Sequence, residues 1–226
     1  MLTGVVFCPQ APVLVSGVGL GDDPDLDAVR SACRTAIRRV ATPGTRVAIL
    51  GSGDRPGLFA PSSRGSFAAL GADVTVCLGP DQEGPLDLPL SLTVGAWLVR
   101  DALGAQSSAT GAAVSATAPT WPDLDADVVV VVGDGSARRT TGGPGYLDDR
   151  AQGFDGRQAD ALRSGEPSRL APDAELGAQL LAAGVPAWTA AAGLPGRYDA
   201  ELLYDAAPFG VGYFVATWTR RETPDA

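Results

Sequence analysis

The sequence predicts a single α/β domain over residues 1–226, in which a mostly parallel or mixed central sheet lies between two layers of helices. The run Asp127–Val132 is the first support, because five consecutive valines are typical of a strand buried on both faces. The second is the alternation of short apolar runs with segments of helical spacing. The third is size, since 226 residues with 45% hydrophobic content can bury one large core. The expected class is therefore a three-layer α/β/α fold.

Four apolar runs are expected to form the central sheet. Leu2–Phe7 is short and apolar, and the prolines that follow it stop the strand. Arg46–Leu50 and Asp127–Val132 each lead into a loop of glycine, serine and aspartate. Phe209–Thr217 is the last apolar run of the chain. Two further strands are predicted, Asp73–Cys77 and Ala112–Thr117.

Helical spacing is clearest in Pro24–Val40, where Leu26, Val29 and Cys33 share one face. Asp23 stands at the position of an N-cap, and a proline follows it at the first helical position. The Thr-Pro-Gly sequence after the segment ends this helix. The other predicted helices are Ser91–Leu103, Asp148–Leu162, Pro172–Ala183 and Val185–Ala192.

The net charge and the cysteine content limit the classes of binding partner and the cellular compartment that we expect for this protein. The net charge is −9 and the basic residues are scattered, which argues against binding to nucleic acid or to an anionic membrane surface. No apolar run approaches the roughly 20 residues that span a bilayer, and no secretory signal pattern is expected at the N-terminus. The three cysteines lack CxxC spacing, so we expect buried thiols and a cytoplasmic location.

The chain contains no histidine, and all of its 17 basic residues are arginine. The absence of histidine excludes Ser-His-Asp and Cys-His hydrolysis in their usual forms, together with any His-ligated zinc or iron site. The absence of lysine excludes Schiff-base chemistry and the Walker-type phosphate loop. Acid–base chemistry would have to come from Asp, Glu, Tyr or Cys.

Two loops with similar composition follow predicted strands. Gly51–Asp54 follows the second strand and Gly133–Ser136 follows the valine run. Ligands of open α/β sheets bind beyond the carboxyl ends of the strands, so the polar side chains of both loops are expected at one edge. The alternative is two unrelated turns, because glycine, serine and aspartate are common turn residues. A dinucleotide fingerprint is disfavoured, since its glycine spacing is wrong by one residue and Pro56 interrupts it.

Several segments, spread over nearly the whole chain, carry a resemblance to a known family. Cys8–Val15 resembles the amino-terminal motif of the class III extradiol ring-cleavage dioxygenase superfamily, in its B-subunit-like, Memo-related branch. Gly133–Arg138 is similar to the Gly-Asp-x-Ser-His-Arg motif of that branch. The remaining matching segments are Pro144–Tyr146, Arg150 with Phe154-Asp155, and Tyr204 with Ala207–Tyr213. The resemblance implies the three-layer fold, and for active members a ferrous iron held by two His and one Glu.

The departures from the family motifs remove the iron chemistry that the resemblance implies. Gln10 stands at the position of the first histidine ligand, and Ala137 stands at the position of the acid–base histidine. The second histidine ligand is expected after the second strand, where this chain has Gly51–Asp54. Only the carboxylate ligand has a counterpart, for which Glu201 is the candidate. We therefore expect a protein of this family that has lost Fe(II) binding and ring cleavage, with no cofactor.

The remaining polar residues are predicted to line a ligand-binding cleft. Asp54 and Asp134 are candidates for Mg²⁺ or Ca²⁺, which accept carboxylate oxygens. Arg138 either binds a ligand carboxylate or phosphate or forms a surface ion pair. Ser136 either contacts a ligand or caps a turn. The full candidate set is Gln10, Ser52, Asp54, Asp134, Ser136, Arg138, Glu201 and Tyr204.

Two functions remain open from the sequence. The first is a non-catalytic protein of the dioxygenase fold that binds an unknown small molecule or a protein subunit. The second is an enzyme with different, histidine-free chemistry, either a dioxygenase-like oxidoreductase or a hydrolase that depends on a hard metal. A deep pocket and a carboxylate of raised pKa would favour the second. A homodimer is also expected, since relatives in the superfamily often pair.

Overall fold

A computed structural model describes residues 1–19, 23–80 and 83–221 of the chain. Its main sheet has seven strands in the order β3-β6-β2-β7-β1-β9-β8. In chain order these strands are β1 (Gly4–Cys8), β2 (Val47–Ser52), β3 (Gly57–Phe59), β6 (Ala109–Val114), β7 (Val128–Val132), β8 (Tyr198–Ala206) and β9 (Tyr213–Arg220). Strands β6, β2, β7 and β1 run parallel, whereas β9 runs antiparallel to β1. The predicted α/β class with a mixed central sheet is confirmed.

The valine run lies at the centre of the sheet, as the sequence predicts. Val129 is paired with Val5 of β1 on one side and with Ala48 of β2 on the other. Val128, Val130 and Val132 face one core cluster, and the intervening valines face the other. All five valines are buried, because helices cover both faces of the sheet at β7. The first polar side chain after the strand is that of Asp134.

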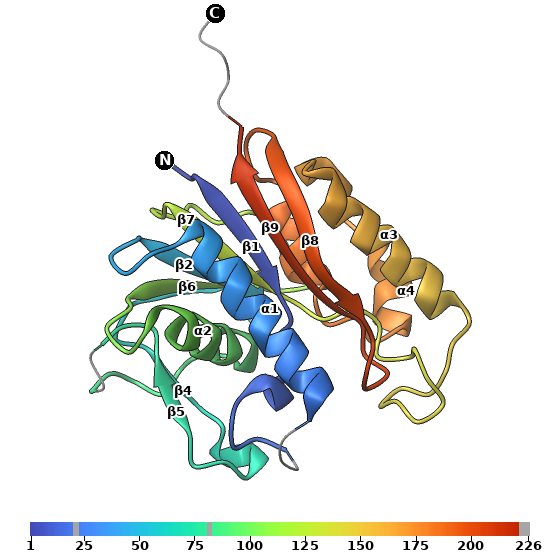
Figure 1. Ribbon diagram of the computed structural model, residues 1–226, viewed down its shortest axis with the longest axis horizontal. Helices are drawn as coiled ribbons and strands as arrows, with labels where there is room; N and C mark the ends of the chain where they lie inside the picture. Colours follow the sequence, from blue (N-terminus) through green and yellow to red (C-terminus); the bar gives the residue numbers. More distant parts are fainter. Residues whose placement is uncertain (20–22, 81–82, 222–226) are drawn as a thin grey trace, which may run out of the picture.

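Helices cover both faces of the sheet (Figure 1). One face carries α1 (Pro24–Val40) and α2 (Leu90–Leu103), and the other carries α3 (Arg150–Ser164) and α5 (Val185–Ala191). The short helix α4 (Ala174–Gln179) precedes α5. Single 3-10 turns form at Pro12–Leu14, Ala68–Leu70 and Pro167–Arg169.

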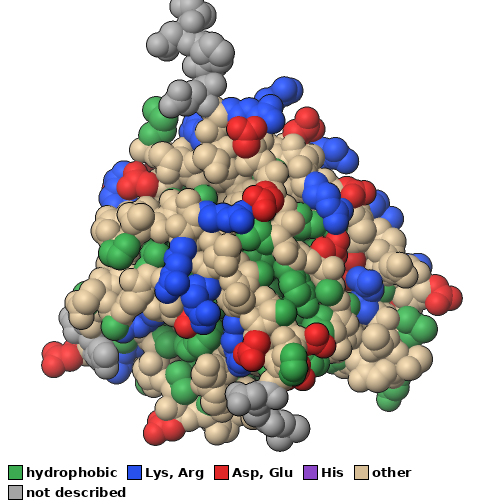
Figure 2. Space-filling model, in the orientation of Figure 1, with side chains coloured by type: hydrophobic (Ala, Val, Ile, Leu, Met, Phe, Trp, Pro, Cys, Tyr) green, Lys and Arg blue, Asp and Glu red, His purple; other side chains and the backbone are tan. Residues whose placement is uncertain are grey.

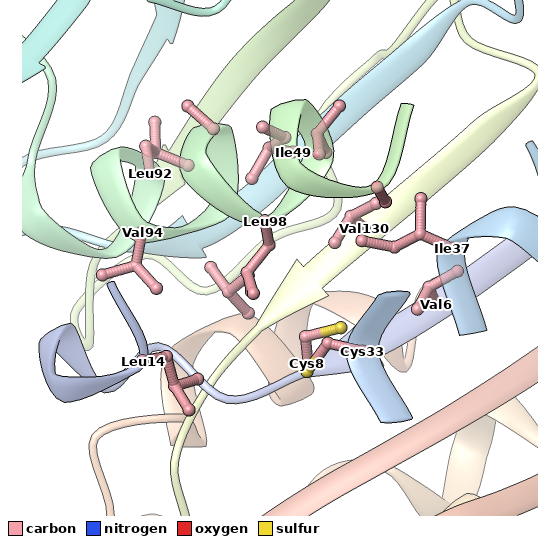
Figure 3. Packing of buried hydrophobic residues seen from close by; sticks show 14 of the residues in the cluster. Val6, Cys8, Leu14, Cys33, Ile37, Ile49, Leu92, Val94, Leu98 and Val130 are labelled. Atoms are coloured by element: carbon pink, nitrogen blue, oxygen red, sulfur yellow. The ribbon is translucent and has the colours of Figure 1, made fainter. Parts of the chain in front are cut away.

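Helix α1 starts and packs as its sequence predicts. The Asp23 side chain accepts a hydrogen bond from the Asp25 N–H, which satisfies one of the free donors at the helix start. Cys33 and Ile37 point from α1 toward Val6 and Cys8 of β1 (Figure 3). Burial, aided by the neighbouring Cys8 thiol, raises the pKa of the Cys33 thiol. All three cysteines are free and buried, so Cys8 serves the core rather than an open surface.

Several sequence expectations about strands need correction. The strand predicted at Ala112–Thr117 is β6, which begins at Ala109 and ends at Val114. Strand β8 lies at the edge of the sheet and was not predicted, because its acidic and exposed residues weaken the apolar pattern. The last strand starts at Tyr213 rather than Phe209, since a turn at Gly210 with positive φ precedes it. The strand expected at Asp73–Cys77 is β5 (Thr75–Cys77), and it pairs with β4 (Arg64–Ser66) in a separate two-stranded sheet.

Among the helices of the described residues, none has the length and apolar character that crossing a bilayer requires.

Candidate functional site

The first family-like segment and the loop after β7 meet at the carboxyl ends of two parallel strands. The Gly133 N–H donates to the Cys8 carbonyl over 2.9 Å, which continues the pairing of β1 and β7 beyond the strands. Next to it, the Gln10 backbone N–H donates to Oδ1 of Asp134, also over 2.9 Å. Two residues that are 124 positions apart are thus joined at the sheet edge where α/β proteins bind ligands.

Asp134 is the carboxylate whose environment is most unusual at this edge. Burial raises its pKa to about 7, and the hydrogen bonds from the backbone N–H groups of Gln10 and Ala11 offset only part of the effect. No arginine is paired with it among the described residues. Such a carboxyl group exchanges its proton near neutral pH, as functional carboxylates often do.

Tyr213 is a site residue that the sequence reasoning missed. It is the first residue of β9, and it is 2% exposed. Burial raises the pKa of its phenol, and the nearby charges of Asp134 and Tyr204 add to the increase. Tyr213 therefore stays a neutral hydroxyl beside Asp134. Tyr213 is the last residue of the closing segment Ala207–Tyr213, and no other feature of the local sequence marks it.

The side chain of Gln10 has an unsatisfied acceptor. Its Oε1 atom is buried and has no hydrogen-bond partner in the part of the chain that the structure describes. A buried oxygen without a donor is unfavourable, so such a group is often explained by a missing partner. Gln10, Asp134 and Tyr213 are called the strand-end site below.

A partly exposed apolar surface adjoins the strand-end site. Figure 2 shows hydrophobic side chains reaching the surface between α1 and α3, over β8 and β9. Tyr204, Phe209 and Val211 are partly buried and pack against the core cluster that contains Tyr213. The rings of Phe209 and Tyr213 are 6.5 Å apart. Hydrogen-bonding groups and apolar rings thus lie together, as in many small-molecule sites.

Ser136 supports the 133–136 loop from inside the protein. It is fully buried, its Oγ donates to the Leu180 carbonyl over 3.0 Å, and it accepts from the Arg138 N–H over 3.0 Å. Of the two expectations for Ser136, the structure shows the turn cap. The backbone of the loop is also tied to β9, because Gly135 donates to Gly212 and Gly212 donates to Ser136.

Asp155 of α3 anchors the same loop. Its side chain is 1% exposed, accepts from the Ser136 N–H over 2.8 Å and forms an ion pair with Arg139 over 2.8 Å. Burial raises the pKa of Asp155, although these two donors oppose the change. Gly212 passes so close that a side chain there would collide with the Asp155 carboxylate. The carboxylate therefore holds the loop and β9 in place.

The two similar loops lie at the same sheet edge, as predicted. Ser52 ends β2, and its Oγ donates to the Ala183 carbonyl over 2.9 Å. The following residue, Gly184, donates its N–H to the Asp134 carbonyl over 2.8 Å. Asp54 lies further out, is exposed and makes no side-chain hydrogen bond within the described residues. The structure therefore links Ser52 to the Asp134 loop and leaves Asp54 in solvent.

The other three candidates lie at different places. Arg138 is half-buried, and its Nε atom has no hydrogen-bond partner among the described residues. Glu201 lies in the middle of β8, where it pairs with Thr217, and its carboxylate forms an exposed ion pair with Arg39 over 2.5 Å. The ion pair lowers the pKa of Glu201. Tyr204 lies on β8 opposite Val215 of β9, and burial raises the pKa of its phenol.

The residues at this edge do not fit a ferrous iron. Gln10 and Ala137 stand where the resemblance described above would expect histidine, and the candidate carboxylate, Glu201, forms an ion pair with Arg39. No group of three or more Cys, Asp or Glu side chains able to hold a metal occurs within residues 1–19, 23–80 and 83–221. A Mg²⁺ or Ca²⁺ ion held by Asp54 and Asp134 remains a hypothesis. Among the described residues, no third Cys, Asp or Glu side chain joins these two to complete such a site. The groups that the strand-end site does offer are the Gln10 amide, the Asp134 carboxyl and the Tyr213 hydroxyl.

Four surface cavities of about 260 to 450 Å³ are lined by other residues of the described chain. Gln10, Asp134 and Tyr213 line none of these four cavities.

No protein-family model matches the chain, and no curated protein matches it either. Among solved structures, the chain is similar to an uncharacterized protein, JW3007, from Escherichia coli K12, with a TM-score of 0.50 and 11% sequence identity. The alignment covers 96% of this chain and 99% of that chain. At this identity the likeness shows the fold, over nearly the full length of both proteins.

Proposed function

We propose that this chain is a histidine-free protein of the class III extradiol dioxygenase-like fold that binds a small molecule at the strand-end site. One observation carries the proposal: the segments that resemble the family motifs are the ones that interlock around Asp134. Gln10 from the first segment binds Asp134 from the second. The second is fixed by Asp155 from the third and by Gly212 from the closing segment. This arrangement supports a retained binding site without retained iron.

The free groups of the strand-end site define the chemistry of the ligand. Gln10 Oε1 lacks a donor, and Asp134 is an acceptor once it loses its proton. Tyr204 and Phe209 supply apolar ring surface next to them. A ligand with two adjacent hydroxyl or amino donors on an aromatic or otherwise apolar frame would satisfy both acceptors and cover the rings.

An enzyme is the second candidate, and the raised pKa of Asp134 favours it. A carboxyl group that titrates near neutral pH can act as a general acid or base without histidine. The neutral phenol of Tyr213 would then stabilise charge on the substrate by donating a hydrogen bond. The binding function requires fewer steps and comes first, because the site has no metal set and no nucleophile activated by a base.

The binding proposal is tested by calorimetric titration with catechol in the presence of a chelator. We expect catechol to bind, and 1,2-dimethoxybenzene, which has the same frame but no donors, to bind far more weakly. Asp134→Asn should weaken catechol binding about 10- to 100-fold at pH values above 7, because it removes a charged acceptor. Gln10→Met should weaken it roughly fivefold, since it removes one neutral acceptor.

Asp73→Asn serves as the matched control for that titration. Asp73 is exposed and lies before β5, so this change should leave catechol binding unaltered. Equal affinity for catechol and 1,2-dimethoxybenzene would count against a site that recognises the hydrogen-bond donors of its ligand. So would an Asp134→Asn variant that binds catechol as tightly as the wild type.

The missing imidazoles lead to a separate prediction about iron. After anaerobic reconstitution with Fe(II), we expect the protein to retain no stoichiometric iron and to form no yellow ring-opened product from catechol or protocatechuate. Iron of this class needs nitrogen donors with open positions and a base for the phenolic proton. Gln10→His alone should not restore activity, because Ala137 still offers no acid–base group. Stoichiometric iron together with ring cleavage by the wild type would overturn the proposal.

A cytoplasmic location and a homodimer remain part of the proposal. The three free, buried thiols suit a reducing compartment. Light scattering at high protein concentration tests for self-association.

A further inference from the structure

A cavity of about 360 Å³ lies between helix α3 and the 168–173 segment, away from the strand-end site. Its walls combine one apolar ring, one amide, one hydroxyl and several charged side chains. They include Phe154, Arg157, Gln158, Ser168, Arg169 and Asp173. The volume is large enough for a small organic molecule.

Gln158 gives this cavity an unsatisfied donor. The residue is 2% exposed, and its Nε2 atom is buried without a hydrogen-bond partner among the described residues. An apolar side chain of similar length would fill the same space without that penalty. A buried amide at the wall of a cavity is therefore better explained by a partner that enters the cavity.

The arginine side chains of the cavity have no partner among the described residues, whereas each of its two carboxylates already has one. Arg157 and Arg169 form no ion pair and no side-chain hydrogen bond within the described part of the chain. Asp160 forms an ion pair with Arg163 over 3.1 Å. Asp173 accepts a hydrogen bond from the Leu176 N–H over 2.9 Å and so caps helix α4. The cavity thus presents two guanidinium groups and the Ser168 hydroxyl as exposed donors, and the amide of Gln158 is a further, buried donor of a residue at its wall.

We propose that this cavity binds the carboxylate or phosphate group of a small molecule. Arginine forms paired hydrogen bonds with both groups through its planar fork, and a neutral amide donor adds one more. The inference is independent of the strand-end site, because none of the cavity residues belongs to that site. It adds a second ligand to a protein whose overall net charge of −9 would otherwise repel anions.

The test is a titration of the purified protein with inorganic phosphate and, separately, with malonate, followed by amide NMR shifts. We expect saturable shifts in α3 and in the 168–173 segment with at least one of the two anions, and the tighter anion identifies the group. The double variant Arg157→Gln with Arg169→Gln should weaken that binding at least about tenfold. Arg55→Gln removes an exposed arginine outside the cavity and should leave the affinity unchanged.

Gln158→Met separates a binding role from a packing role. It keeps the length of the side chain and removes the donor, so we expect a higher melting temperature and a several-fold loss of anion affinity. A lower melting temperature with unchanged affinity would show that the amide serves packing and would overturn its role in the site. Non-saturable shifts with both anions, or equal affinity in the double arginine variant, would overturn the whole proposal.

Discussion

Replacing Asp155 with alanine should lower the free energy of unfolding by about 3 to 5 kcal/mol, the usual effect of breaking a buried pair from one side. The carboxylate is 1% exposed and holds both the Ser136 N–H and the Arg139 guanidinium. Its removal leaves two donors without their acceptor, one of them charged. Denaturant unfolding monitored by tryptophan fluorescence measures the loss.

Asp160→Ala is the control on the same helix. Asp160 is exposed and pairs only with the exposed Arg163, so its removal should change stability by less than about 1 kcal/mol. Similar losses for the two variants would show that Asp155 is an ordinary surface carboxylate and does not anchor the loop.

The second large effect concerns the pH dependence that Asp134 gives to stability. Its pKa is about 7 in the folded protein, against about 3.9 for an aspartate in an unfolded chain. Between these values the folded state binds more protons than the unfolded state, so stability falls as the pH rises. The contribution is fully present below about pH 4, decreases through neutrality and is lost above about pH 7.

Between about pH 5 and pH 8, the contribution of Asp134 should change by roughly 2 to 3 kcal/mol. The side chain of the Asp134→Asn variant cannot titrate. The free energy of unfolding of the wild type minus that of the variant, measured at each pH, therefore isolates the contribution of Asp134 from those of all other groups. We expect the wild type to lose stability relative to Asp134→Asn as the pH rises. A constant difference across this range would show that Asp134 has an ordinary pKa and would remove the argument for proton exchange.

The fold was predictable because buried strands and helices have recognisable patterns of apolar residues in the sequence. Only a strand covered by helices on both faces tolerates five valines in a row, and the structure places that strand at the centre. Helix α1 was predicted to its ends because Asp23 and Pro24 signal its start. Strand β8 was missed because an edge strand exposes half of its length, so Glu201 and Asp205 break the apolar pattern.

The site was only partly predictable, because side-chain roles depend on contacts across the sheet. The Gly-Asp-Gly-Ser loop pointed to Asp134, and the parallel strands brought Gln10 next to it. The burial that raises the pKa of Asp134 and the position of Tyr213 beside it have no local signal. The resemblance to the family motif suggested Glu201 as a metal-binding carboxylate. In the structure Glu201 pairs with Thr217 in the sheet, and its carboxylate forms an ion pair with Arg39.

A crystal structure of the metal-free protein soaked with catechol tests the central proposal most directly. We expect density for the ring against Tyr204 and Phe209, with its hydroxyl groups within hydrogen-bond distance of Gln10 Oε1 and the Asp134 carboxylate. The same soak with Asp134→Asn should show reduced occupancy. Catechol bound only elsewhere, or a metal ion between Gln10 and Asp134, would contradict a metal-free binding site at the ends of β1 and β7.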